Sequence, residues 1–197
     1  MYVPSEFACD EPTALAMIDA HPFALLVVPD LDAAHVPLVR RGASLIGHVA
    51  RASSLADAIE ARSPALAVFS GPHAFISPRT YVSPRQVPTW NYVTTHVHGA
   101  LSPISDVEGA VEVLRVLSRA FDPTWDAEPM LGARASGLLQ GIVAFELRVE
   151  RVTGKRKLGQ NRADVDRIAA AHALEIAGTD DARVIGAAML AIPARAR

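Results

Sequence analysis

The sequence has little of three things that would mark a protein class at once: cysteine, excess positive charge and long hydrophobic runs. Cys9 is the only cysteine, which excludes a disulfide framework or a cysteine-based zinc site within one chain. Lys and Arg number 19 against 21 Asp and Glu, so the basic excess typical of a free-standing nucleic-acid-binding protein is missing. No apolar run approaches a membrane span, and the first residues do not resemble a signal peptide. We therefore expect a cytoplasmic protein without a membrane segment.

The amino-acid composition is typical of a folded domain. Half of the 197 residues are hydrophobic and the mean hydropathy is +0.21, so a sizeable core is expected and global disorder is not. The length suits a single domain. We expect one barrel domain over residues 1–160, with C-terminal helices in residues 161–197 packed on the same domain.

The spacing of apolar residues predicts short strands interrupted by helices. Few strand–helix–strand units are regular enough for a doubly wound parallel sheet. We therefore expect an α+β fold, a mostly antiparallel β-barrel with peripheral helices and a C-terminal helical segment. The expected strands are residues 23–28, 35–40, 44–50, 65–70, 74–77, 92–97 and 142–152. The expected helices are residues 10–20, 54–62, 105–121, 130–139, 162–177 and 180–192.

Helix starts are marked by polar residues ahead of the apolar periodicity. Asp10 precedes Pro12, and capping boxes begin at Ser54 and Ser105. The third of these helices has apolar residues at helical spacing, which predicts a single buried face. That face would consist of Val107, Val111, Leu114, Leu117 and Phe121.

A first candidate binding segment lies at residues 47–54, where a strand leads into a helix start. Free N–H groups at a helix N-terminus suit a phosphate. The planar guanidinium of Arg51 can bind a phosphate through two nitrogens, and Ser53 and Ser54 add hydroxyls. The alternative is that Ser54 only caps the helix and Arg51 is a surface charge.

A second candidate lies at residues 88–92, ahead of a β-branched run. Trp90 could stack on a planar ligand and Asn91 could bind ring edges. The alternative is a strand start in which Trp90 fills the core. Upstream, residues 70–73 have turn chemistry and would form either the rim of the same site or a plain hairpin turn.

Two further groups are weaker signals. Residues 154–162 are rich in basic side chains, and they could bind a phosphate, a carboxylate or nucleic acid, or form a solvated loop. His96 and His98 share one face of a strand, but no third ligand is suitably spaced, so we expect hydrogen-bonded histidines and no metal site. No Ser-His-Asp arrangement, P-loop or dinucleotide fingerprint is present.

Taken together, these segments resemble the PaiB-type family of FMN-binding negative transcriptional regulators. The resemblance runs through six blocks in the family's order and nearly from end to end. The blocks are the opening Met1-Tyr2-Val3-Pro4 and Phe7 together with His21-Pro22-Phe23, then His35-Val36-Pro37-Leu38, Gly47-His48-Val49-Ala50-Arg51-Ala52, Phe69-Ser70-Gly71-Pro72-His73-Ala74-Phe75-Ile76-Ser77-Pro78, Val87-Pro88-Thr89-Trp90-Asn91-Tyr92 and Gly154-Lys155-Arg156-Lys157-Leu158-Gly159-Gln160-Asn161.

The resemblance implies a split β-barrel of the flavin-reductase and pyridoxamine-oxidase type, a homodimer with FMN in the seam between its subunits. It implies that Arg51 and Ser53, with His48 beside them, contact the phosphate. Ring contacts would come from Trp90 and Asn91. The residues expected to close the seam are Lys157, Gln160 and Asn161.

Three positions depart from the family's usual residues. Gly159 stands where serine is usual, Ser53-Ser54 stands for Asn-Pro, and Phe75 replaces a common tyrosine. Each change removes or alters a polar contact. The departures at the first two positions bear directly on the implied FMN site.

The functional hypothesis is an FMN-binding, PaiB-like negative transcriptional regulator. No helix-turn-helix signal is present, so we expect indirect regulation or a basic surface that the dimer assembles. An alternative is a flavin-dependent reductase or oxidase of a small molecule. A third, ranked last, is a haem pocket, with an axial ligand from one of four histidines. These are His48, His73, His96 and His98.

Overall fold

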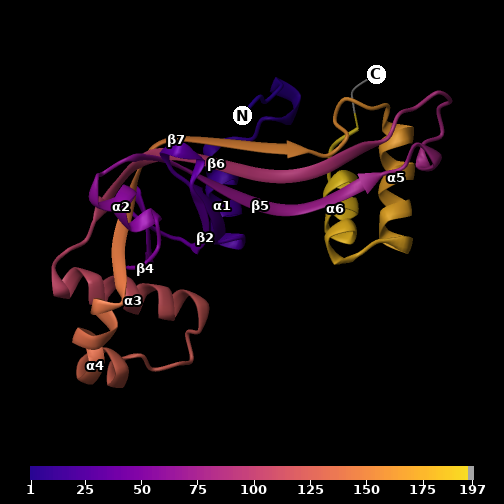
Figure 1. Ribbon diagram of the computed structural model, residues 1–197. Helices are drawn as coiled ribbons and strands as arrows, with labels where there is room; N and C mark the ends of the chain where they lie inside the picture. The colour runs from indigo at the N-terminus through magenta and orange to yellow at the C-terminus, as the bar shows by residue number, and fades with distance from the viewer. Residues whose placement is uncertain (195–197) are drawn as a thin grey trace. The chain divides into compact units, whose positions relative to one another are not determined.

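The computed structural model describes residues 1–194, apart from the side chains of residues 133–136 and 177. Its seven strands form one sheet in the order β2-β1-β5-β6-β7-β4-β3, and the strand pairs with recorded register are antiparallel. Figure 1 shows β5, β6 and β7 as the long strands of this sheet. The strands are β1 (Phe23–Val27), β2 (Ala33–Pro37), β3 (Val39–Arg41), β4 (Ser44–Ala50), β5 (Pro64–Ile76), β6 (Thr89–Pro103) and β7 (Ile142–Lys157). The predicted antiparallel α+β architecture is confirmed.

Six α-helices accompany the sheet. They are α1 (Glu11–Ala20), α2 (Leu55–Glu60), α3 (Val107–Phe121), α4 (Glu128–Gln140), α5 (Asp164–Ala177) and α6 (Asp180–Leu190), with short 3-10 helices at Ser5–Phe7, Pro29–Leu31 and Pro78–Thr80. Within residues 1–194, none of these helices combines the length and apolar character that a membrane crossing requires.

The chain divides into two compact units, and β5, β6 and β7 each contribute residues to both. Unit 1 comprises residues 1–14, 70–95 and those from 153 onward, and unit 2 comprises residues 15–69 and 96–152. The predicted division at residue 160 stays a prediction, and residues 195–197 of the predicted C-terminal segment lie outside the described residues.

Unit 1 is built around the α5–α6 hairpin. Small residues of α5 and α6 pack against Leu158 and the end of β5, because alanines allow close approach of the backbones. The buried cluster consists of Ala74, Ile76, Leu158, Ala170, Ala171, Ala182, Ile185 and Met189. The carboxylate of Asp166 on α5 accepts hydrogen bonds from the backbone N–H groups of Val82 (2.9 Å) and Ser83 (2.8 Å), which ties the β5–β6 connection to the helix.

In unit 2, α3 packs on β4 and β7. Ile46 of β4 and Ala144 of β7 form one buried cluster with Ala110, Val113 and Leu117 of α3. This corrects the predicted helix face, because Val107 is 65% exposed and Phe121 is 48% exposed. Leu117 of the predicted face is buried, and Val111 and Leu114 are partly buried. Periodicity therefore identified part of the buried stripe and misplaced its two ends.

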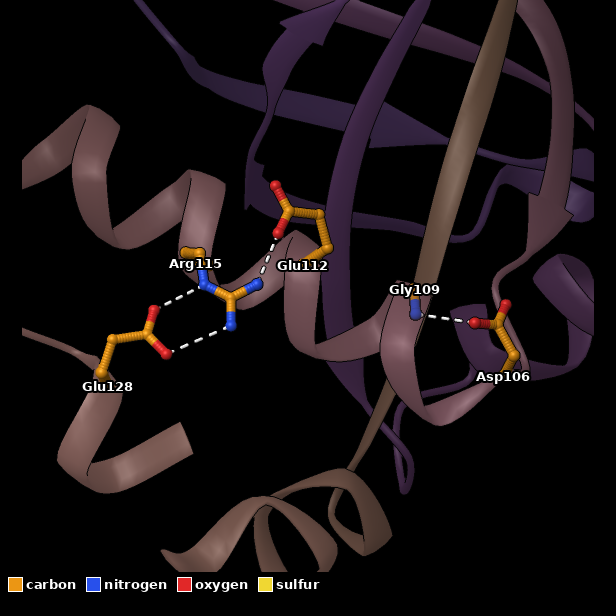
Figure 2. Close-up of polar contacts among 5 residues, drawn as sticks. All are labelled: Asp106, Gly109, Glu112, Arg115 and Glu128. Carbon is orange, nitrogen blue, oxygen red and sulfur yellow. Dashed lines mark hydrogen bonds and ion pairs between the residues drawn. The ribbon is translucent and has the colours of Figure 1, made fainter. Parts of the chain in front are cut away.

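The start of α3 is also different from the prediction. The side chain of Asp106, not Ser105, accepts the hydrogen bond from Gly109 N (2.7 Å), as Figure 2 shows. The predicted cap at Ser54 is wrong as well, since Ser54 has helical φ and ψ and its side chain makes no capping bond. The cap predicted at Asp10 is confirmed by the bond from Thr13 N (3.0 Å).

Two strands continue where the sequence indicated loops. The predicted turn at residues 70–73 is wrong, because β5 runs unbroken from Pro64 to Ile76. Likewise β7 extends to Lys157, so residues 154–157 of the basic segment predicted to follow the strand belong to it.

Candidate functional site

An exposed tryptophan on β6, in unit 1, forms the wall of a shallow cavity. Trp90 is 51% exposed, and its ring centroid lies 5.4 Å from that of His73 and 6.0 Å from that of Phe75. His73 and Phe75 are two residues apart on β5, so they share a face, and β6 carries Trp90 beside them. The neighbouring rings orient the indole without burying it.

The cavity beside Trp90 has a volume of about 310 Å³. We call it the Trp90 hollow. Its walls are mainly apolar, and they include the exposed indole face, which suits a planar aromatic ligand. The lining residues are Ser70, Gly71, His73, Trp90, Tyr92, Val93 and Thr94.

A lysine at the end of β7 holds the backbone beside the hollow. Lys157 Nζ donates to the carbonyl oxygen of Trp90 (2.7 Å) and to Thr89 Oγ1. Burial lowers the pKa of Lys157, and the nearby charges of Lys155 and Arg162 lower it further. Two residues earlier, Lys155 Nζ lies 5.3 Å from the centroid of the Tyr92 ring, a cation–π contact. Positive charge therefore lies directly behind the hollow.

The residues after Lys157 form a tight turn. Gln160 Oε1 accepts from Leu158 N (2.7 Å) and its Nε2 donates to the carbonyl oxygen of Arg156 (2.5 Å). Gly159 has a φ of +82°, a left-handed conformation that favours glycine. The conformation accounts for glycine at a position where the family usually has serine. Asn161 is exposed.

The asparagine next to Trp90 points the other way. Because neighbouring strand residues face opposite sides, Asn91 is turned inward and is only 2% exposed. Its Nδ2 lies 3.3 Å from Met189 Sδ, and its Oδ1 is enclosed without a hydrogen-bond partner among the described residues. In this arrangement Trp90 can contact a ligand directly, whereas Asn91 supports the strand from within.

The predicted phosphate residues lie in unit 2. The guanidinium of Arg51 donates from Nε to the carbonyl oxygen of Gln140 (3.1 Å) and from Nη2 to that of Ile142 (2.6 Å). Arg51 is exposed, and its Nη1 has no hydrogen-bond partner among the described residues. Ser53 Oγ accepts from Leu55 N (3.3 Å). Arg51 therefore has a structural role at the start of β7 and also a free donor edge.

His48 lies in a different environment from Arg51. It lines an apolar cavity with residues of α3 and α4, whereas Arg51 lines a polar one with Glu60 and Asp106. Burial lowers the pKa of His48, so the imidazole is neutral near pH 7. The two side chains thus open into separate cavities of the same unit.

Sequence reasoning included Tyr92 in the candidate segment without giving it a role, missed the contributions of Val93 and Thr94 to the hollow, and treated His73 as part of a turn. The alternation of residues between the two faces of a strand was the signal that could have placed His73 correctly. Read as one strand, β5 places Gly71, His73 and Phe75 on one face. Gly71 and Pro72 obscured that pattern in the sequence, because both residue types are typical of turns.

The two strand histidines do not complete a metal centre within the described part of the chain. No group of three or more His, Cys, Asp or Glu side chains there is arranged to hold a metal ion. Burial lowers the pKa of both His96 and His98, and the charge of Arg151 lowers them further.

Comparison with known proteins identifies the family. The family described as "Putative FMN-binding domain" matches residues 1–151. Protease synthase and sporulation protein PAI 2 of Bacillus subtilis (strain 168) is 35% identical over 127 residues, which cover 62% of this chain and 60% of that protein. An uncharacterized protein of Emericella nidulans is 24% identical over 146 residues, or 64% of this chain and 58% of that protein. The chain thus spans about 60% of the length of these curated relatives.

Solved structures show the same fold at low identity. The flavocytochrome Anf3 from Azotobacter vinelandii matches with a TM-score of 0.64 and 19% identity, over 76% of this chain and 69% of that chain. The FAD and haem binding protein from Mycobacterium smegmatis matches with a TM-score of 0.62 and 18% identity, over 75% of this chain and 71% of that chain. Because the family match covers more than half of its residues, the chain belongs to the PaiB-type FMN-binding family, whose cofactor is FMN and whose fold is the split β-barrel.

Proposed function

We propose that this protein, as a cytoplasmic homodimer, binds FMN with the ring in the Trp90 hollow and serves in negative regulation of transcription. The observation that carries the proposal is the half-exposed indole of Trp90, held between His73 and Phe75 beside a cavity of about 310 Å³. Large exposed aromatic rings at a concave surface commonly serve recognition.

The residues of the hollow fit a flavin ring. The indole offers a stacking face, and Lys157 places a positive charge behind it. When bound, FMN would supply a ring that accepts and returns electrons, and the protein's part is to hold and orient that ring. We propose Arg51 and Ser53 as phosphate contacts, because Arg51 keeps one guanidinium nitrogen uncommitted. Gln160 and Asn161 would shape the turn that follows Lys157.

The first test is the visible absorption of the purified protein before and after FMN is added, with Trp90→Ala as the variant. Loss of a stacking partner typically costs 1–3 kcal/mol, so the dissociation constant for FMN should rise about 5- to 150-fold. Trp125→Ala is the matched control, since Trp125 is equally exposed but lies in unit 2. Equal loss in both variants would contradict the assignment of the ring to the Trp90 hollow.

Arg51→Ala tests the phosphate assignment separately. We expect weaker binding of FMN and little change in binding of riboflavin, which has the same ring without the phosphate. If the variant weakens both ligands equally, Arg51 acts only through its bonds to the carbonyl oxygens of Gln140 and Ile142.

The helices of the C-terminal region support indirect regulation. Arg167 on α5 is 2% exposed and donates to Asp164 Oδ1 (2.9 Å). Arg183 on α6 pairs with Asp180. Neither helix therefore exposes a row of unpaired basic side chains that could enter the major groove of DNA. Salt-dependent binding of the protein to promoter DNA, measured by fluorescence anisotropy, would identify direct contact.

A flavin-dependent oxidoreductase is the second candidate, and His73 favours it. Its imidazole contacts Trp90, and its Nε2 lies 3.8 Å from Asp181 Oδ2. A histidine oriented by a carboxylate at a ring-binding site can donate or accept a proton. Bleaching of the FMN absorption by NADH or NADPH without air, lost in His73→Ala, would support the enzyme.

A further inference from the structure

Unit 2 contains a cavity whose described lining shares no residue with the Trp90 hollow and does not include Arg51. It has a volume of about 250 Å³ and lies between α3, α4 and the β4–β7 pair. We call it the His48 cavity. Its lining residues are His48, Leu114, Ser118, Trp125, Met130, Leu131, Leu138 and Ile142.

The polar atoms of this cavity are few and unengaged. His48 Nδ1 is enclosed and has no hydrogen-bond partner within the described residues. Because Nδ1 is enclosed and His48 lines the cavity, we assign Nε2 as the nitrogen that faces a ligand. Because burial lowers the pKa of this imidazole, the ring is neutral and can exchange one hydrogen bond with an uncharged group. Among the described lining residues, Ser118 is the one that carries an aliphatic hydroxyl.

The remaining walls are apolar, and several of them are exposed. Trp125 is 50% exposed, and Met130 and Leu138 are each 37% exposed. Apolar side chains clustered around a concavity gain free energy when a ligand removes them from water. An indole and a thioether together favour an aromatic ligand, through ring stacking and sulfur–aromatic contact. Among the described lining residues none is charged, so a charged ligand would lose its hydration there without compensation.

The walls of the cavity are held by an ion-pair network. Figure 2 shows the guanidinium of Arg115 on α3 between Glu112 of the same helix and Glu128 at the start of α4. Arg115 Nε lies 2.5 Å from Glu128 Oε1 and its Nη1 lies 2.5 Å from Glu112 Oε2. This contact joins the start of α4 to α3, so the two helices that carry most of the lining are fixed to each other.

We propose that the His48 cavity binds a small uncharged aromatic molecule with one hydroxyl group, of the phenol class. The ring lies against Trp125 and Met130, and the hydroxyl bonds to His48 Nε2. The size supports this class, because drug-sized ligands occupy cavities of about 300–1,000 Å³ and this one is smaller. This site is separate from the proposed FMN site and does not depend on it.

The test compares phenol with toluene, which has nearly the same shape but no hydroxyl, by titration calorimetry with the full chain. In the wild-type protein both bind, and phenol binds more tightly. In His48→Leu the affinity for phenol falls about 2- to 12-fold, the range expected for one lost hydrogen bond, and the affinity for toluene does not fall. A parallel loss of both ligands would overturn the role of His48.

Two further variants test the place of binding. Leu138→Trp fills the cavity and should abolish binding of both probes, and Trp125→Ala should weaken both. Circular dichroism verifies that each variant is folded. Trp90→Ala, which removes the ring wall of the proposed FMN site, should leave phenol binding unchanged. No phenol binding at millimolar concentration in the wild-type protein, or binding unaffected by both cavity variants, would refute the proposal.

Discussion

At the scale of single residues, close backbone approach explains which glycines the fold requires. A Cβ at Gly99 of β6 would lie 2.0 Å from the carbonyl oxygen of Arg148 on β7, and that oxygen cannot move without disturbing its strand. At Gly132 in α4, apart from the adjoining helix itself, no atom of the described residues lies within 4 Å of the same position. Close packing therefore requires glycine at position 99, whereas packing gives no reason for glycine at position 132.

Gly99→Ala should lower the free energy of unfolding by about 1–3 kcal/mol, because the added methyl group overpacks the strand pair. Gly132→Ala should raise it by about 0.5–1 kcal/mol, since alanine is the better helix former. Urea denaturation measures both. If Gly99→Ala proves as benign as Gly132→Ala, the close approach of β6 to β7 at this point is not present in solution.

At the scale of elements, the start of α3 shows how a cap is chosen. Both Ser105 and Asp106 are residues that cap helices well, and the sequence placed the capping box one residue early. The structure selects Asp106, because its extended backbone directs the carboxylate to Gly109 N. The carboxylate also interacts favourably with the positive end of the helix dipole.

Asp106→Ala should destabilise the protein by about 1 kcal/mol through loss of this cap. Ser105→Ala should change the stability by less than about half of that, since its side chain makes no capping bond. Thermal denaturation followed by circular dichroism distinguishes the two variants. A larger effect at Ser105 would restore the capping box that the sequence indicated.

At the scale of the whole molecule, three partly buried histidines make stability depend on pH. Burial lowers the pKa of His48, His96 and His98 from the ordinary value of 6.5. In the unfolded chain these side chains take up protons as the pH falls through about 6.5, whereas in the folded protein they do so only at lower pH. Protonation therefore favours the unfolded state across that interval.

The free energy of unfolding should thus be highest above about pH 7 and should decrease as the pH falls through about 6.5 towards the lower folded pKa values. Urea denaturation at a series of pH values measures the slope. His48→Gln should flatten it, because one of the three buried sites is removed. Stability that stays constant or increases on acidification between about pH 7 and pH 5 would contradict this assignment.

The sequence by itself determined the family, the element types and the α+β class. Six ordered blocks carried the family, and the strand at residues 44–50 was predicted with the bounds that β4 has. These features could be predicted because they rest on local chemistry: the spacing of apolar residues, polar caps and residue types at fixed distances along the chain.

Only the tertiary structure decided how these elements face one another. In the structure β5 continues through Gly71 and Pro72, Trp90 faces outward and Asn91 faces inward. The contact with the sheet also decides which stripe of α3 is buried. It also separated His48 and Arg51, three residues apart, into different cavities. The side that a residue faces depends on the neighbouring strand or helix, which lies far away in the chain, so local pattern could name the candidate residues but not their surroundings.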